Sequence, residues 1–138
     1  MDPLSMTTTC LALLSAASKV TGYVTDFVVS YREARNDIAA VSRELSDLDI
    51  TLHILKHEAE ANELNHLPKD LRQHIHHIMV NCTTVLVDLE ALLREYRGPG
   101  LDRAAKWTLS GRKEAEKIRV SLETHKRALG LVVEVTTL

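Results

Sequence analysis

The chain has 138 residues, a net charge of −2 and two cysteines, Cys10 and Cys82. This length suffices for one domain with its own core, and two isolated cysteines exclude a disulfide framework, so we expect both to be buried in a reducing, intracellular compartment. Aromatic residues make up 4% of the chain, and there are only five glycines and three prolines, a composition typical of a helical bundle.

The first twenty residues, MDPLSMTTTCLALLSAASKV, carry no charge between Asp2 and Lys19. A secretory signal begins with basic residues, and this stretch begins with an acidic one, so export is not expected. Asp2 followed by Pro3 is typical of a helix start, because a carboxylate accepts free backbone N–H groups and proline tolerates the first helical position. Serine and threonine residues interrupt the run of about 20 apolar residues that a membrane span needs. The stretch therefore predicts a helix over 3–22.

An apolar residue recurs every three or four positions from Val24 to Ala59. This spacing places one apolar stripe on a single face and predicts a long amphipathic helix over 24–61. Its predicted core positions are Ile38, Leu45 and Leu52.

The pattern breaks in the segment NHLPKD, where Pro68 is expected to begin the next helix. The apolar spacing then resumes and predicts a helix over 68–97, which Gly98 and Gly100 end. Its predicted core positions are Ile78, Val85 and Leu92.

A last helix is predicted over 101–135, although the segment LVVEVTTL at its end is also compatible with a strand. Its predicted core positions are Ile118, Leu122 and Leu129. Trp107 is the only tryptophan and stands in a segment rich in lysine and arginine. We expect this ring to anchor the start of the last helix against the bundle, with no ligand involved. His125 occupies a stripe position, where a half-buried imidazole that forms a hydrogen bond across the bundle is expected.

Four amphipathic segments joined by short breaks can bury their stripes only against one another. The sequence therefore predicts an all-α fold, a four-helix bundle with long helices in an up-down-up-down order, forming one domain over residues 1–138. The same spacing is compatible with an intermolecular coiled coil, and this alternative stays open.

Charge is distributed unevenly along the chain. Between Arg32 and Leu93 there are six basic and eleven acidic residues, whereas between Arg94 and Arg127 there are ten basic and five acidic residues. One interpretation is two solvated faces that attract each other within the bundle. The other is a basic surface for anionic lipid or another chain. The candidates for this basic surface are Arg103, Lys106, Arg112, Lys113, Lys117, Arg119, Lys126 and Arg127.

No constellation of residues predicts catalysis. His53 and His57 lie one helical turn apart and a histidine cluster spans 74–77, but no further ligand completes a metal spacing. No nucleophile has a base at a motif spacing, and the segment LSGRKE lacks the glycines and the Lys-Ser/Thr pair of a P-loop. We therefore expect no enzymatic activity, no metal, no cofactor and no small-molecule substrate. Nucleic acid is not an expected partner, because the basic residues lack interleaved aromatics.

Two stretches together resemble a known family. The opening MDPLS and the later KWTLSGRKEAEKIRVSLETHKRALGLVV are similar to the two ends of the fungal N-terminal domain of STAND proteins, the HeLo-like group found in NOD-like receptors. The resemblance extends over nearly the whole chain, and the middle agrees in helical pattern only. The residues that carry it are Asp2, Pro3, Leu4, Ser5, Lys106, Trp107, Lys113, Glu114, Leu122, Glu123, His125, Lys126 and Leu129.

This resemblance implies an effector or signalling domain that induces regulated cell death by oligomerisation and membrane targeting. The chain has no P-loop and no repeats, so we expect an excised domain or a short stand-alone member. The alternative function is a soluble homotypic or adaptor module that assembles receptors without acting on membranes. Expected partners are further copies or related helical domains, and anionic membrane lipids, with a cytoplasmic location and recruitment to the plasma membrane on activation. Helix-1 candidates for membrane contact, which are equally compatible with the bundle core, are Leu4, Leu11, Leu14 and Val20.

Overall fold

The computed structural model describes residues 3–96 and 101–137, with side chains described at 6–96 and 103–137. All regular structure in these ranges is helical. The helices are α1 (Pro3–Ser30), a 3-10 helix (Arg32–Ala34), α2 (Arg35–Glu60), a second 3-10 helix (Glu63–His66), α3 (Lys69–Glu95), α4 (Leu101–Lys106), a π-helical turn (Trp107–Gly111) and α5 (Arg112–Thr136).

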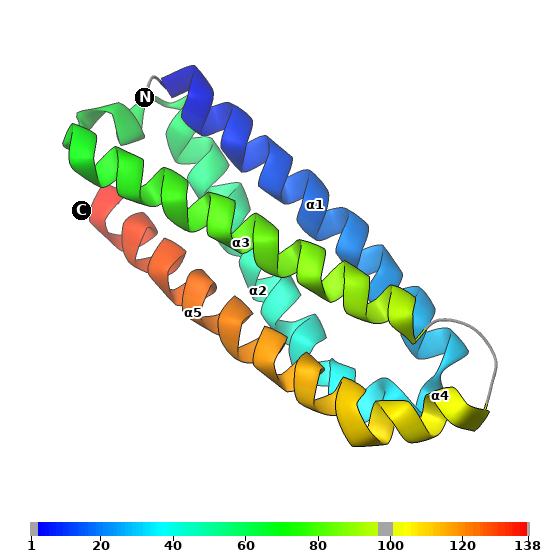
Figure 1. The fold of residues 1–138 in the computed structure, drawn as a ribbon. Coiled ribbons are helices and arrows are strands. Elements are labelled where there is room, and N and C mark those ends of the chain that lie inside the picture. The colour runs from blue at the N-terminus through cyan, green and yellow to red at the C-terminus, as the bar shows by residue number, and fades with distance from the viewer. Residues whose placement is uncertain (1–2, 97–100, 138) are drawn as a thin grey trace.

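The four long helices α1, α2, α3 and α5 form a bundle (Figure 1). They alternate in direction along the chain, so the predicted up-down-up-down fold is confirmed. Around the bundle, however, α1 packs against α2 and α3, and α5 packs against the same two helices. The consecutive helices α2 and α3 are therefore diagonal to each other, and the parallel pairs α1/α3 and α2/α5 are neighbours.

The apolar stripes of the four helices meet in one core, as the periodicity predicted. Eight of the nine predicted core residues are buried, and Ile78 is partly buried and packs against the core. All side chains classed as buried in the described ranges are hydrophobic. The eight buried residues are Ile38, Leu45, Leu52, Val85, Leu92, Ile118, Leu122 and Leu129.

The predicted boundary between the first two helices was wrong. The chain stays helical through Gly22 and turns only at Tyr31, whose φ of −140° and ψ of 75° lie outside the helical region. A lone glycine weakens an exposed helix by about 1 kcal/mol but does not end it when neighbouring side chains are packed. The 3-10 helix at Arg32–Ala34 keeps a three-residue spacing and buries Ala34, so the apolar pattern crosses the turn without a break.

The second break lies where the sequence predicted it. Helix α2 ends at Glu60, and Asn62 follows in the left-handed region with φ of 62°, a conformation that asparagine tolerates better than most residues. Pro68 precedes α3 with an extended ψ of 148°. The predicted end of the third helix at 97 and the glycines after it lie outside the described residues.

The last predicted helix is interrupted by one π-helical turn between α4 and α5. Such turns insert an extra residue into a helix and are often found at functional sites. The segment at the C-terminal end is helical through Thr136, so the strand alternative is wrong for its described part.

Candidate functional site

Helix α1 contributes a full side of the core. Its buried residues are spaced alternately by four and three positions, which is the seam of a helix packed along its whole length. None of the described helices combines the length and apolar content that a membrane crossing requires. The buried residues of α1 are Met6, Cys10, Leu13, Ala17, Val20, Val24 and Phe27.

The four membrane candidates of the first helix therefore have different surroundings. Val20 is buried in the core, and Leu14 is partly buried and packs against it. Leu11 is 46% exposed, and Leu4 has a side chain outside the described residues. The structure does not bring these four residues together on one free face.

Three basic candidates on α5 form ion pairs within that helix. The Arg119 guanidinium lies 2.7 Å from Glu116 and 3.0 Å from Glu123, and Arg127 lies 2.6 Å from Glu123. Lys117 lies 3.3 Å from Glu114. Their charge is thus partly neutralised on the helix surface, although such exposed pairs add little to stability.

Two further basic candidates connect α5 to α2. The Lys126 ammonium lies 2.8 Å from Glu44 and 3.3 Å from Asp47, and the hydrogen bond with Glu44 is the main cause that raises the pKa of Lys126. Arg112 lies 3.1 Å from Asp37. These contacts agree with the interpretation that the basic and acidic segments attract each other inside the bundle.

Lys106 and Lys113 are different, because neither forms an ion pair within the described part of the chain. Both are exposed, and they lie on either side of Leu109, which is 73% exposed. Arg103 is half-buried, and its Nη1 atom is buried without a hydrogen-bond partner. The bundle end near α4 thus has basic groups beside one protruding apolar side chain.

All five aromatic residues of the chain gather at that end, which we call the aromatic end: Tyr23, Phe27, Tyr31, Tyr96 and Trp107. Trp107 is 1% exposed, and its ring lies 5.3 Å from that of Phe27 and 5.4 Å, edge to face, from that of Tyr96. Tyr96 also shares a 2.8 Å hydrogen bond with the hydroxyl of Ser110 in the π-helical turn. Trp107 thus packs the start of the last predicted helix against the bundle, where the sequence analysis placed an anchoring ring.

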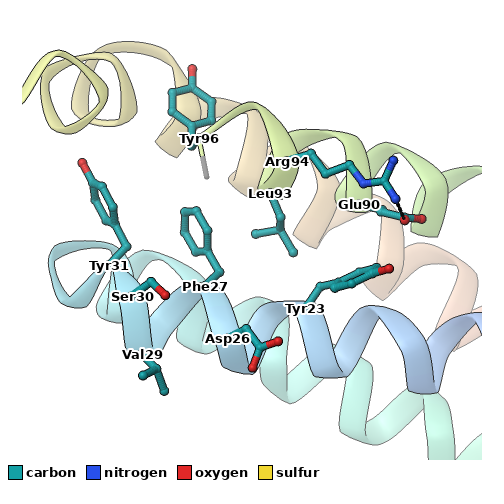
Figure 2. Close-up of a pocket in the computed structure, with 10 residues that line it drawn as sticks. All are labelled: Tyr23, Asp26, Phe27, Val29, Ser30, Tyr31, Glu90, Leu93, Arg94 and Tyr96. Atoms are coloured by element: carbon teal, nitrogen blue, oxygen red, sulfur yellow. Dashed lines mark ion pairs between the residues drawn. The ribbon is translucent and has the colours of Figure 1, made fainter. Parts of the chain in front are cut away.

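A cavity of 590 Å³ opens beside these rings, between the C-terminal halves of α1 and α3 (Figure 2). Phe27 and Leu93 point toward each other at its centre, and Arg94 pairs with Glu90 at 2.9 Å on its rim. The Tyr31 hydroxyl is buried without a hydrogen-bond partner, and desolvation, followed by the charge of Glu33, raises the pKa of Tyr31. The remaining lining residues are Tyr23, Asp26, Val29, Ser30, Tyr31 and Tyr96.

The histidines and cysteines make contacts both within and between helices: Nδ1 of His76 lies 3.3 Å from the Thr9 hydroxyl, and Sγ of Cys10 lies 3.8 Å from Sδ of Met79. The ring of His125 contacts the carbonyl of Ser121 at 2.6 Å in its own helix, so the predicted bond across the bundle was wrong. In the described ranges, no three His, Cys, Asp or Glu side chains lie close enough to hold a metal ion. Cys10 and Cys82 are free and buried, and this burial raises their thiol pKa values to about 11 and about 12.

A second surface was missed by the sequence analysis. Ile50 and Ile54 on α2 and Leu131 and Val135 on α5 are exposed by 40% or more, and we call them together the α2/α5 face. Ile50 and Leu131 line one groove between the two helices, and Leu131 and Val135 line a second groove between α3 and α5. The sequence did contain a signal for this surface. All four apolar residues fall outside the periodic stripes, so they could not belong to the predicted core.

These features define a class: an all-α bundle with an aromatic cavity at one end and an apolar face along one side. Residues 1–102 match the model of the family described as pigment biosynthesis cluster protein PigL, N-terminal. The match spans more than half of the chain, so the chain belongs to this family, a fungal-type N-terminal domain. No match was found among curated proteins or among solved structures.

Proposed function

We propose that this chain is an N-terminal signalling domain of a fungal STAND-type receptor and that its role is binding rather than catalysis. It acts as a homotypic or adaptor module that assembles receptors through contacts between helical domains. The α2/α5 face carries this proposal, because it places Ile50, Ile54, Leu131 and Val135 in solvent on two neighbouring helices. Exposed apolar side chains that gather on neighbouring helices are typical of protein–protein contacts.

The arrangement of α1 supports this function over insertion into a membrane. Leu13 and Val20 lie in the core, so transfer of α1 into lipid would remove them from their packing against α2 and α3. The apolar side chains of α2 and α3 that α1 covers would then face water, at a cost of about 1.5–3 kcal/mol for each fully exposed leucine or valine. Contact through the α2/α5 face requires no such rearrangement.

The test is an association assay with the isolated chain, run against other copies and against related helical domains. Leu131→Asp should weaken the association, whereas Lys113→Glu, on α5 but away from the face, should not. Anionic vesicles loaded with dye provide the second readout. Leakage without any protein–protein association would contradict the module function.

A membrane-acting effector is the second candidate, and the environment of Leu109 favours it. This side chain is exposed between Lys106 and Lys113, neither of which has an ion-pair partner among the described residues. One apolar group and a few basic groups are each weak membrane signals that act together and weaken with salt. Under this function, Leu109→Glu should abolish binding to anionic vesicles, and Leu131→Asp should leave it unchanged.

A further inference from the structure

We infer that the α2/α5 face binds a second copy of this chain in an antiparallel arrangement, with a two-fold axis passing near Gly130. This inference rests on the proposed interaction function and adds the identity of the partner and its register. The observations that carry it are the shape of one groove and the order of the charges along it.

The groove between α2 and α5 has a volume of 600 Å³ and is lined by residues of both helices. Gly130 lies in this lining, and a Cβ placed there would meet nothing within 4 Å. The next residue, Leu131, is 61% exposed. A recess without a side chain thus lies beside a protruding leucine, which is the pairing that two identical faces need for interlocking.

Two opposite charges on α5 lie at equal distances on either side of the Gly130–Leu131 position. Arg127 and Glu134 both line the groove, and the midpoint between them falls between Gly130 and Leu131. They are separated by two helical turns, or about 10 Å along the axis at about 1.5 Å per residue. A two-fold axis through this midpoint brings Arg127 of each copy opposite Glu134 of the other.

Both of these charged groups are available for a partner. The Arg127 side chain is 74% exposed, and its pair with Glu123 lies within one helix, so an additional carboxylate can approach it. Glu134 is exposed and forms no ion pair with any described residue. On the α2 side of the groove, Asp47 is already paired with Lys126, so this side adds no unpaired charge.

The order of these charges also selects the orientation. A copy packed in the parallel direction would place Arg127 beside Arg127 and Glu134 beside Glu134, and such like-charge contacts oppose association. The antiparallel copy converts both into opposite-charge contacts. It also places Leu131 of each copy over Gly130 of the other, where the groove has room.

The test is sedimentation equilibrium of the full chain from low micromolar to several hundred micromolar concentration. The wild type should show a monomer–dimer equilibrium. Leu131→Asp should raise the dissociation constant at least tenfold, because it places a charge in the centre of the interface. Arg127→Glu alone and Glu134→Arg alone should each raise it by about tenfold, because each creates two like-charge contacts.

The double variant Arg127→Glu with Glu134→Arg is the decisive comparison, because it reverses both charges and should recover the wild-type dissociation constant within about threefold. Leu109→Asp is the matched control, since Leu109 is even more exposed than Leu131 but lies at the aromatic end, and it should leave the equilibrium unchanged. Circular dichroism checks that all variants remain helical.

The outcomes separate this inference from the proposed function. A dimer that does not respond to Leu131→Asp, or a double variant no better than the single ones, overturns the antiparallel contact. A chain that stays monomeric but binds a related helical domain overturns the second copy as partner and leaves the module function standing. A chain that binds neither contradicts both.

Discussion

The indole N–H of Trp107 donates a hydrogen bond to Oδ2 of Asp37 at 2.8 Å, across 70 positions of sequence. The other carboxylate oxygen, Oδ1, lies 3.1 Å from Nε of Arg112. Asp37 is in the first turn of α2, where a negative charge is favoured by the helix dipole. One carboxylate therefore connects the start of α2, the π-helical turn and the start of α5.

Asp37→Ala should destabilise the fold by about 1–3 kcal/mol, because it leaves the buried indole N–H without an acceptor. The measurement is urea unfolding followed by tryptophan fluorescence, with a blue-shifted native spectrum in the wild type. Asp49→Ala, which removes a more exposed carboxylate from the same helix, serves as the control and should change stability by less than about 0.5 kcal/mol. Equal stability of the two variants would contradict the role of Asp37.

Gly111→Ala should destabilise the chain by about 1–3 kcal/mol, because the buried ring beside it has no free space to move into. A Cβ at Gly111 would collide with Cε3 of Trp107. The same substitution at Gly22, where nothing lies within 4 Å, should instead stabilise α1 by about 0.5–1 kcal/mol. Thermal unfolding of both variants shows whether each substitution lowers or raises the stability. A stabilised Gly111→Ala chain would disprove the close packing.

Leu45→Ala and Leu122→Ala should each cost about 2–5 kcal/mol, because both leucines are fully packed in the core. Ile50→Ala is the matched control in α2, since Ile50 is 60% exposed, and it should change stability by less than about 0.5 kcal/mol. Denaturant midpoints measure all three. If the two leucine variants unfold at the wild-type midpoint, the stripe does not form the core.

Periodicity predicted the bundle because burial of an amphipathic stripe depends only on local spacing. It could not place the turn at Tyr31, since a 3-10 helix preserves that spacing, and it gave no hint of the diagonal placement of α2 and α3. Ion pairs such as Lys126 with Glu44 depend on which helices become neighbours, so the same charge counts were compatible with a free basic surface. Trp107 was predictable as an anchor because a lone large ring in a charged segment is most stable when buried.

The buried thiols should make the chain unreactive toward a thiol reagent at pH 8 until it unfolds. Burial raises the pKa of Cys10 to about 11 and that of Cys82 to about 12, from the ordinary thiol value of 9.0. Because the folded pKa values are raised, the stability that the protonated thiols contribute is complete below pH 9.0 and is lost as the pH rises through the folded values. Rapid labelling of both cysteines in the native chain would contradict this burial.

Leu11→Glu should leave the fold intact, whereas Leu13→Glu should unfold it. Leu11 is exposed on α1, so a glutamate there remains in water, but at Leu13 the charge would be buried in the core without a partner. Circular dichroism and thermal unfolding measure this difference.

Because Leu11→Glu retains the bundle, it also tests the membrane role of the first helix, which a core variant cannot do. If α1 entered lipid, a forced oligomer of Leu11→Glu would leak anionic vesicles less than the wild-type oligomer. If the domain acts through the α2/α5 face, the two oligomers behave alike on vesicles and associate equally well.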